Sequence, residues 1–365
     1  MAAGLRDGGY RGQIVLVGAE KAMPYERPHL SKGFLLGTVG LEELALRPPI
    51  QYRQLDVDLE LGQRVADLGL EDRRILLEDG KTLGWDMLCL ATGSDARRLR
   101  GFVKAMYVRE LPEAQRLRAR IEAGEPLAIA GAGFIGCEVA AAARQKGCPV
   151  RVFEALDQPL SRVLGPQLGR YLASVHREHG VELHMKADAP LDVDLVAVGS
   201  TPRVEMAARS GLQVEGGIIT DECGRTSVPN VYAAGDVARF HHPLFETHIR
   251  VEHFQTSQRF GFTVGRTMAG AATPYTEAPW FWSDQYDLNL QYVGAGLPWD
   301  ETVVRGKLGA PPFTVFYLSG GRLIAAAGVN DHHTVARARH VMEARKEVTK
   351  TQLKNPEFDL RKALS

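Results

Sequence analysis

One stretch of the chain combines glycines and an acidic residue in the spacing that holds a dinucleotide. The apolar run 127–130 leads into Gly131-Ala132-Gly133-Phe134-Ile135-Gly136, and Glu154 follows at about the expected 20-residue offset. Gly131 would permit a tight turn, Gly133 would let backbone approach a pyrophosphate, and Gly136 would let a helix pack closely on a strand. The N–H groups at the start of that helix would bind the phosphates. Glu154 would accept hydrogen bonds from a ribose and repel a 2′-phosphate, which favours NADH over NADPH.

A strand, a helix and a second strand are needed to position these residues. The sequence predicts the first strand at 127–130, the helix at about 134–146 and the second strand at 149–153. Strands alternate with helices through the first two-thirds of the chain, and this alternation predicts parallel sheets. A further buried strand, 194–199, ends at Gly199.

A second unit of the same kind is expected at the N-terminus, with only its latter half present. Residues 14–17 predict a strand, and Glu20 is the acidic residue after it. The same offset counted back from Glu20 places the glycine loop before Met1, so we expect this unit to lack its first strand and phosphate loop. A later strand at 87–90 runs into Ala91-Thr92-Gly93.

Asp236 closes another buried strand, which begins at Val231. One interpretation is that its carboxylate caps the helix that follows. Another is that it is presented to a ligand. The two interpretations are compatible, since a helix start that caps itself can also present its carboxylate and N–H groups.

Length and composition restrict the class of protein. The 365 residues suggest two or three domains at about 150 residues each. With 44 basic and 44 acidic side chains there is no net field to attract nucleic acid or an anionic membrane. The longest apolar stretch, 127–143, contains glycines and Glu138, so no membrane span is expected.

Cysteines and histidines predict neither a disulfide scaffold nor a metal site. The four cysteines are far apart in the sequence, which favours a reducing cytoplasm. They are Cys89, Cys137, Cys148 and Cys223. The adjacent pairs His241-His242 and His332-His333 have no thiolate nearby, and we interpret them as surface residues.

Five motifs, at 24–32, 91–94, 131–138, 232–236 and 279–286, occur in an order typical of one family. Pro-Tyr-Glu-Arg-Pro-His-Leu-Ser-Lys and Phe-Trp-Ser-Asp-Gln are the most specific. Over nearly its whole length the chain resembles the NADH-dependent ferredoxin reductases that serve bacterial aromatic-ring dioxygenases and haem monooxygenases. The resemblance implies an α/β fold with two Rossmann-like three-layer nucleotide-binding domains, as in glutathione reductase, and a C-terminal α+β domain.

The resemblance also implies domain bounds. The FAD-binding domain would comprise 1–106 and 224–272, the NAD-binding domain 107–223, and the C-terminal domain 273–365. Within the last of these we expect strands at 314–318 and 323–327 and a basic helix from about Thr334.

The resemblance implies FAD and NADH as cofactors. It also implies that Lys32 and Glu138 are catalytic residues, which form an ion pair at the flavin near the nicotinamide. A lysine there would stabilise a reduced, anionic ring, and the carboxylate would hold the lysine. Charges are rarely buried unpaired, so on an apolar helix we prefer this pair to a solvated lysine and a helix-surface glutamate. The other implied FAD contacts are Glu20, Arg27, Val65, Ala91, Thr92, Gly93, Arg109, Asp236, Phe254, Trp280 and Trp282. For NADH they are Gly131, Gly133, Ile135, Gly136, Glu154 and Gly199. For either tryptophan, ordinary core packing is an equal alternative.

The implied activity is electron transfer from NADH through FAD to a ferredoxin-type iron–sulfur protein. No cysteine pair lies between Ser31 and Gly40, where disulfide reductases carry theirs, so electrons would leave directly from the flavin. An acidic partner would need a basic patch. Its candidate residues are Arg305, Lys307, Arg337 and Arg339.

Two other functions stay open. The absent N-terminal loop, and a stretch at 184–192 too short for a β-meander, suit a flavin-poor nucleotide-binding or redox-signalling protein of the same fold. An NADH oxidase, or a nitrite or rubredoxin reductase, would share the fold, because fold does not determine the electron acceptor.

Overall fold

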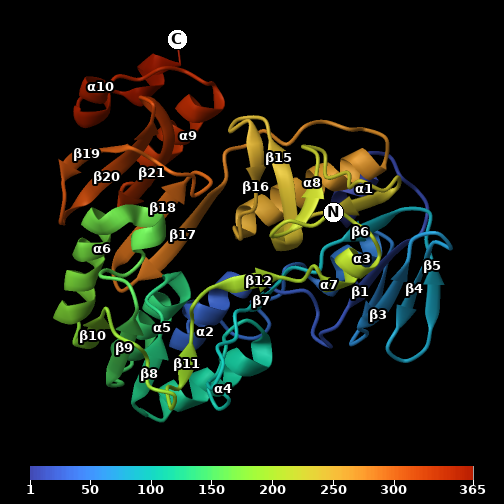
Figure 1. Ribbon diagram of the computed structural model, residues 1–365, viewed down its shortest axis with the longest axis horizontal. Helices are drawn as coiled ribbons and strands as arrows, with labels where there is room; N and C mark the ends of the chain where they lie inside the picture. Colours follow the sequence, from blue (N-terminus) through green and yellow to red (C-terminus); the bar gives the residue numbers. More distant parts are fainter. Residues whose placement is uncertain (365) are drawn as a thin grey trace. The chain divides into compact units, whose positions relative to one another are not determined.

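The computed structural model describes residues 1–364, which form two compact units (Figure 1). Unit 1 consists of Met1–Glu26, Ala45–Asp95 and Thr201–Pro279. Unit 2 consists of Arg27–Leu44, Ala96–Ser200 and the chain from Trp280 onward. The three-domain bounds expected from the sequence stay a prediction.

Unit 2 contains the βαβ segment expected around the glycine loop. It consists of β8 (Leu127–Ala130), α5 (Phe134–Gln145) and β9 (Val150–Glu154). With β10 (Val181–Met185) and β11 (Leu195–Val196) these strands form a parallel sheet in the order β10-β9-β8-β11. All four residues of β8 are buried, as in a strand covered on both faces.

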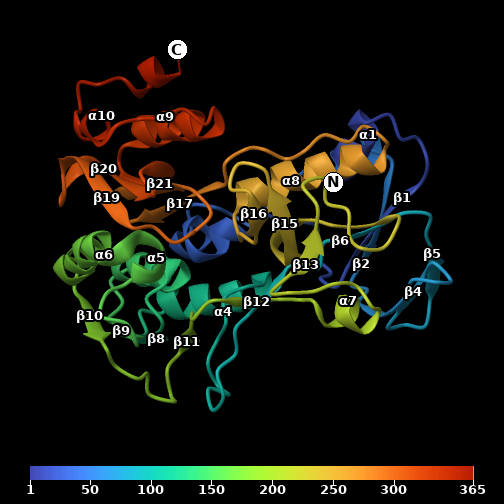
Figure 2. The same ribbon diagram turned by 45° about the horizontal axis from the view of Figure 1, so that its top comes forward.

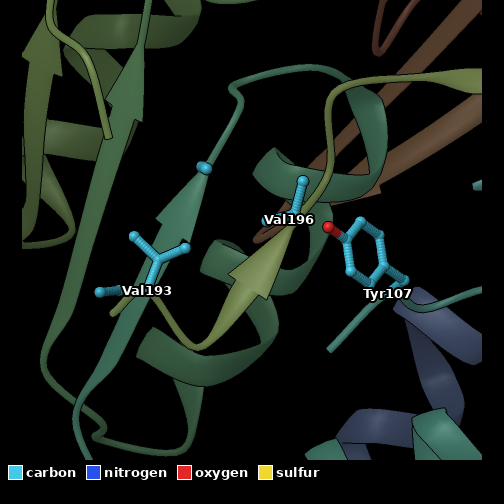
Figure 3. Close-up of a cluster of buried hydrophobic side chains, with 5 residues drawn as sticks. Tyr107, Val193 and Val196 are labelled. Carbon is cyan, nitrogen blue, oxygen red and sulfur yellow. The ribbon is translucent and has the colours of Figure 1, made fainter. Parts of the chain in front are cut away.

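Helices and a compact core support this sheet. A buried cluster of Tyr107, Ala128, Ala130, Val193 and Val196 includes residues of β8 and β11, and Figure 3 shows it with Tyr107, Val193 and Val196 labelled. The supporting segments are η1 (Arg27–Ser31), α2 (Gly33–Leu36), α4 (Leu111–Glu122) and α6 (Ser161–Glu178). Since α2 packs against both α4 and α5, the residues just before it are brought beside α5.

The C-terminal part of unit 2 is an antiparallel sheet covered by helices. Its order is β17-β18-β21-β20-β19. The strands are β17 (Trp280–Gln285), β18 (Leu288–Val293), β19 (Glu301–Lys307), β20 (Ala310–Ser319) and β21 (Arg322–Val329). The helices are α9 (His332–Glu343), α10 (Lys350–Lys354) and η3 (Leu360–Ala363). Figure 2 shows α9 and α10 along one face of this sheet, so the α+β character expected for this region is confirmed.

Unit 1 contains four small sheets. Two are parallel pairs, β1 (Ile14–Gly18) with β2 (Val57–Leu61) and β6 (Leu88–Leu90) with β14 (Val231–Ala233). The others are β3 (Val65–Gly69), β4 (Arg74–Leu77) and β5 (Thr82–Gly84), and β13 (Ile218–Thr220), β15 (Ala238–His242) and β16 (Thr247–Ile249). The helices are α1 (Ala2–Asp7), α3 (Pro49–Gln54), α7 (Glu205–Arg209), η2 (Gly235–Val237) and α8 (Phe254–Met268). Two short strands, β7 (Ser94–Ala96) and β12 (Ser200–Pro202), lie where the chain changes unit.

Strands β1 and β6 of unit 1 have counterparts in β9 and β11 of unit 2, but β8 has none in the described part of unit 1. Glu20 follows β1 as Glu154 ends β9, and Gly93 follows β6 as Gly199 follows β11. In unit 2, β8 lies between β9 and β11, whereas β1 and β6 belong to separate sheets. Among residues 1–364, therefore, no strand of unit 1 occupies the place of β8. Between β10 and β11, residues 186–194 form no strand.

Two interpretations of single residues are wrong. Asp236 does not cap a helix, because it lies inside the three-residue helix η2, whose N-cap is Ala234, and strand β15 follows directly. His242 is not a surface residue, since the alternation of β15 turns it inward, where its Nε2 lies 3.0 Å from Glu277 O. His332 and His333 are exposed at the start of α9. In the described part of the chain, no helix is long and apolar enough to cross a bilayer.

Candidate active site

The glycine loop after β8 has the shape of a dinucleotide-binding turn. Gly131 has a φ of 100°, and a Cβ there would lie 2.5 Å from Ala197 O. A Cβ at Gly136 would overlap Gly131 O. At Gly133, by contrast, a Cβ would meet only Ala197 O, at 3.7 Å. Two glycines are thus required by packing, and the third leaves open space in front of α5, as close approach of a pyrophosphate requires.

Glu154 holds this loop to the end of β9. Its Oε2 accepts a hydrogen bond from Ala132 N at 2.8 Å, and its Oε1 accepts one from Leu156 N at 3.0 Å. Each carboxylate oxygen has a second lone pair, so both can also accept from a ribose hydroxyl. The carboxylate therefore shapes the loop in addition to the ribose contact predicted for it.

The two remaining NADH candidates lie at the same edge of the sheet. Ile135 is exposed in the first turn of α5, and Gly199 is exposed just after β11. Gly199 has a φ of 102°, and no atom lies within 4 Å of a Cβ built there. The carboxyl ends of β8, β9 and β11 thus bring all the NADH candidates to one edge, where open α/β sheets bind ligands.

A buried ion pair lies one turn into α5. Lys32 Nζ is 2.8 Å from Glu138 Oε2, and the two side chains are 12% and 3% exposed. Lys32 immediately precedes α2 and also donates to Pro28 O at 3.2 Å. The structure therefore pairs the two residues predicted to be catalytic, and Glu138 lies two residues after Gly136, the last glycine of the loop.

Two serines complete the surroundings of the Glu138 carboxylate. Ser31 Oγ donates to Oε2 at 2.5 Å, and Ser283 Oγ donates to Oε1 at 2.6 Å. Sequence reasoning missed both, although each stands in a motif on which the resemblance was based. With Lys32, three donors from two distant segments meet on one carboxylate.

Arg27 and Arg109, both predicted near FAD, are in contact in unit 2. Arg27 Nη1 donates to Arg109 O at 2.7 Å, and both side chains are half-buried. The contact links η1 to the residue before the α4 capping box, in which Glu110 and Glu113 take part. Arg27 thus fixes the backbone of Arg109.

Trp280 and Trp282 lie on the face of β17 that points away from Ser283. Side chains alternate along a strand, so the tryptophans share one face, while Phe281 and Ser283 share the other. The two indole ring centroids are 6.1 Å apart, and both rings are half-buried. Phe281 packs edge-on against Phe134 at the glycine loop, with 4.7 Å between ring centroids. Neither tryptophan is a fully buried core residue.

In unit 1 the FAD candidates follow the carboxyl ends of parallel strands. Glu20 follows β1 and accepts a hydrogen bond from Tyr25 Oη at 2.5 Å. Thr92, after β6, donates from its hydroxyl to Arg203 O at 3.0 Å. Asp236, after β14, accepts from Ser257 Oγ at 3.0 Å. Three polar side chains thus follow the ends of β1, β6 and β14.

The space around these residues in unit 1 fits part of a flavin nucleotide. Gly93 and Gly235 have φ values of 69° and 75°, and no atom comes closer than 3.8 Å to a Cβ built at either. Thr256 Oγ1, in the first turn of α8, is buried without a hydrogen-bond partner among the described residues. Open backbone and an unsatisfied hydroxyl suit a polar ligand here. Val65 begins β3 and Phe254 begins α8, and their predicted contacts stay predictions.

Arg305 is wrong as a residue of a docking patch. It is 5% exposed, and its guanidinium donates to three backbone carbonyls of the C-terminal segment. These belong to Gln352, Leu353 and Phe358. Among the other patch candidates Lys307 is exposed, whereas Arg337 and Arg339 form ion pairs with Asp359 and Glu343. Arg305 therefore holds the end of the chain on β19.

Burial raises the pKa of all four cysteine thiols. All are free. Burial raises the pKa of Cys89 to about 12, and burial together with the carboxylates of Glu138 and Glu154 raises the pKa of Cys137. The thiolate is the reactive form of cysteine, so a raised pKa makes both residues inert.

We therefore expect the native protein to react slowly with thiol reagents. At pH 8 a thiol of pKa about 12 is ionised in roughly one molecule in 10,000. Titration with a chromogenic disulfide should release well under one equivalent of thiolate within minutes, and about four after unfolding. Rapid release of two equivalents from the folded protein would instead indicate a redox-active pair.

The comparisons with known proteins agree with this geometry. The family model described as pyridine nucleotide-disulphide oxidoreductase matches residues 1–190 and 189–261, and the reductase C-terminal model matches 280–364. The chain is 39% identical to the ferredoxin--NAD(+) reductase component of the anthranilate 1,2-dioxygenase system of Burkholderia cepacia, covering 95% of this chain and 92% of that protein. It is 34% identical to rhodocoxin reductase of Rhodococcus erythropolis, covering 100% and 91%.

A solved structure agrees as well. The covalent putidaredoxin reductase-putidaredoxin complex matches with a TM-score of 0.95 and 31% identity, covering 100% of this chain and 94% of that chain. The α/β, glutathione-reductase-like fold and the resemblance given above are thereby confirmed. The chain belongs to the pyridine nucleotide-disulphide oxidoreductases, and within them to the ferredoxin--NAD(+) reductases.

Proposed function

We propose that this protein is an FAD-dependent enzyme that oxidises NADH and passes the electrons to a ferredoxin-type iron–sulfur protein. The observation that carries the proposal is the buried Lys32–Glu138 pair two residues beyond an open glycine loop. The Burkholderia cepacia relative, which covers 95% of this chain, supports it, because its name includes ferredoxin--NAD(+) reductase. A cytoplasmic location, supported by four free cysteines, is part of the proposal.

Each part of the chain has a task in this proposal. Bound FAD would supply the chemistry of hydride acceptance from NADH and of one-electron release. The N–H groups at the start of α5 bind the NADH pyrophosphate, and Glu154 orients the adenosine ribose. Lys32 holds a positive charge at a fixed point, because Glu138 and Pro28 O restrain its ammonium group. The residues assigned to FAD from the resemblance remain part of the proposal.

Glu154→Gln is expected to weaken the preference for NADH over NADPH. The amide keeps the volume and one acceptor for Ala132 N but removes the charge that repels a 2′-phosphate. We expect the ratio of kcat/KM for NADPH to that for NADH to rise about tenfold, equal to about 1.4 kcal/mol. Steady-state kinetics with both nucleotides measure this ratio. Glu182→Gln, on the exposed side of β10, is the control and should leave it unchanged.

The proposal is tested by an absorption spectrum followed by titration with NADH. The purified protein should show a flavin band that NADH bleaches without oxygen, and a ferredoxin should restore the band faster than air does. A colourless protein whose spectrum NADH does not change would favour the flavin-poor alternative. Reoxidation by oxygen in preference to ferredoxin would favour an NADH oxidase.

A further inference from the structure

A row of buried polar side chains in unit 2 ends at the Glu138 carboxylate. Ser283 and Gln285 point inward from β17, and His176 lies on α6. All three are buried. Tyr286 is the first member of the row. It lies at the turn between β17 and β18, where its backbone has a φ of 58°. Buried polar groups cost stability unless they are hydrogen-bonded, so the partners of each one matter.

Every member of the row is hydrogen-bonded to the next. Tyr286 Oη lies 3.0 Å from His176 Nδ1, and His176 Nε2 lies 2.9 Å from Gln285 Oε1. Gln285 Nε2 donates to Ser283 Oγ at 3.1 Å, and Ser283 Oγ donates to Glu138 Oε1 at 2.6 Å. The far end is also held by packing, because the ring of His179 stacks on that of Tyr286 with 3.7 Å between centroids.

The chemistry of these groups gives the row one direction. An ionised carboxylate only accepts hydrogen bonds, so Ser283 must donate to Glu138 and accept from the Gln285 amide. The amide oxygen then accepts from His176, which places the imidazole proton on Nε2 and leaves Nδ1 to accept from Tyr286. Burial lowers the pKa of His176 to about 4 and raises that of Tyr286, which keeps the imidazole neutral and the phenol protonated at pH 7. Four donations in sequence therefore point toward Glu138.

This row restrains the carboxylate and does not conduct protons. Its central member is the amide of Gln285, which has no titratable proton to pass on near neutral pH. The polar row is also connected to rigid elements at both ends, the β17–β18 hairpin and helix α5. A fully satisfied buried network of this kind makes one arrangement unique.

We propose that Ser283, Gln285 and His176 are positioning residues that hold the Glu138 carboxylate against Lys32, so that the lysine ammonium stays at one point during electron transfer from NADH. The inference rests on the proposed function. None of the three residues touches Lys32 in the hydrogen bonds of the row, so each acts through Glu138. Around metal sites, mutating residues that orient the ligands through hydrogen bonds costs about 10- to 100-fold in affinity or activity, and we expect an effect at the lower end of that range here.

Gln285→Glu reverses the hydrogen bond between residue 285 and Ser283 while the side-chain volume stays nearly constant. The new carboxylate oxygen accepts from Ser283 where the amide donated, which draws the serine hydroxyl away from Glu138. In rapid-mixing experiments on the FAD-loaded protein we expect the rate constant of flavin reduction by NADH to fall about tenfold, with the Kd for NADH changed less than twofold. Asp284→Asn is the matched control, since Asp284 lies between the two residues in β17 but is exposed on the other face. It should behave like the wild type.

Nuclear magnetic resonance of the imidazole nitrogens gives a second readout that does not depend on turnover. In wild-type protein at pH 7, His176 should be neutral with the proton on Nε2. In Gln285→Glu it should carry protons on both nitrogens, because a carboxylate would face Nε2. If Gln285→Glu does not fold, Ser283→Ala removes the same donor with a smaller change and is expected to give the same tenfold loss.

The outcomes separate this inference from the proposed function. A wild-type His176 protonated on Nδ1, or flavin reduction at the wild-type rate in Gln285→Glu and Ser283→Ala, would overturn the positioning role in a protein that still oxidises NADH. A tenfold loss in Asp284→Asn as well would also overturn it, because the effect would not be specific to the row. A wild-type holoprotein that fails to oxidise NADH would overturn the proposed function and the inference together.

Discussion

Glu138→Ala is expected to lower the free energy of unfolding by about 3–5 kcal/mol, because it leaves a buried charge without its partner. The Lys32 ammonium, 12% exposed, would lose the carboxylate 2.8 Å away. The hydroxyls of Ser31 and Ser283 would lose their acceptor at the same time. Urea unfolding followed by circular dichroism measures the loss, and NADH oxidation should fall with it.

A double variant tests whether the unpaired charge causes this loss. Lys32→Met with Glu138→Leu removes both charges and replaces them with apolar groups of similar size. Such replacements are often neutral or stabilising compared with the original pair, so we expect at least about 2 kcal/mol of the loss to be recovered. NADH oxidation should stay low, since the lysine is gone. Equal stability of the single and double variants would contradict the ion-pair explanation.

Gly133→Ala is expected to raise the Kd for NADH at least tenfold without lowering stability. The backbone at Gly133 has φ −77° and ψ −174°, which alanine adopts freely, and a Cβ there has 3.7 Å of clearance. The added methyl group would occupy the space that the proposed site leaves for the pyrophosphate. Calorimetric titration with NADH and a thermal melt of the same sample measure the two effects.

Gly136→Ala is the contrasting variant at the same loop. Its Cβ would overlap Gly131 O, so the helix would have to move away from the strand, and we expect the melting temperature to fall by several degrees. The two variants therefore distinguish an effect on NADH binding, at Gly133, from an effect on helix packing, at Gly136. If Gly133→Ala bound NADH as the wild type does, the open space in front of α5 would not be the pyrophosphate site.

The glycine loop could be predicted from the sequence because its determinants are local. The expected strand 127–130 matches β8, and the expected helix at 134–146 matches α5 to within one residue at its end. One short segment contains the hydrophobic run, the turn glycines and the change in spacing of apolar residues from strand to helix. Neighbouring residues determine the backbone there. The expected C-terminal strands 314–318 and 323–327 lie within the longer strands β20 and β21.

Contacts between distant segments could be predicted only in part. The pairing of Glu138 followed from the rule that a charge on an apolar helix needs a partner, and the motif at 24–32, which carries the family resemblance, supplied Lys32. Nothing local marks His176 as the partner of Gln285, which is 109 residues away. Arg305 failed for the same reason, because the carbonyls that accept from its guanidinium lie 47 to 53 residues further along the chain. Long-range partners decide both cases.

Strand β8 has a consequence for hydrogen exchange in unit 2. It pairs with β9 on one edge and with β11 on the other, and all four of its residues are buried. Buried amides that are hydrogen-bonded inside a sheet exchange with solvent only when that part of the fold opens. The amides of β8 should therefore be among the slowest in unit 2 to exchange with deuterium.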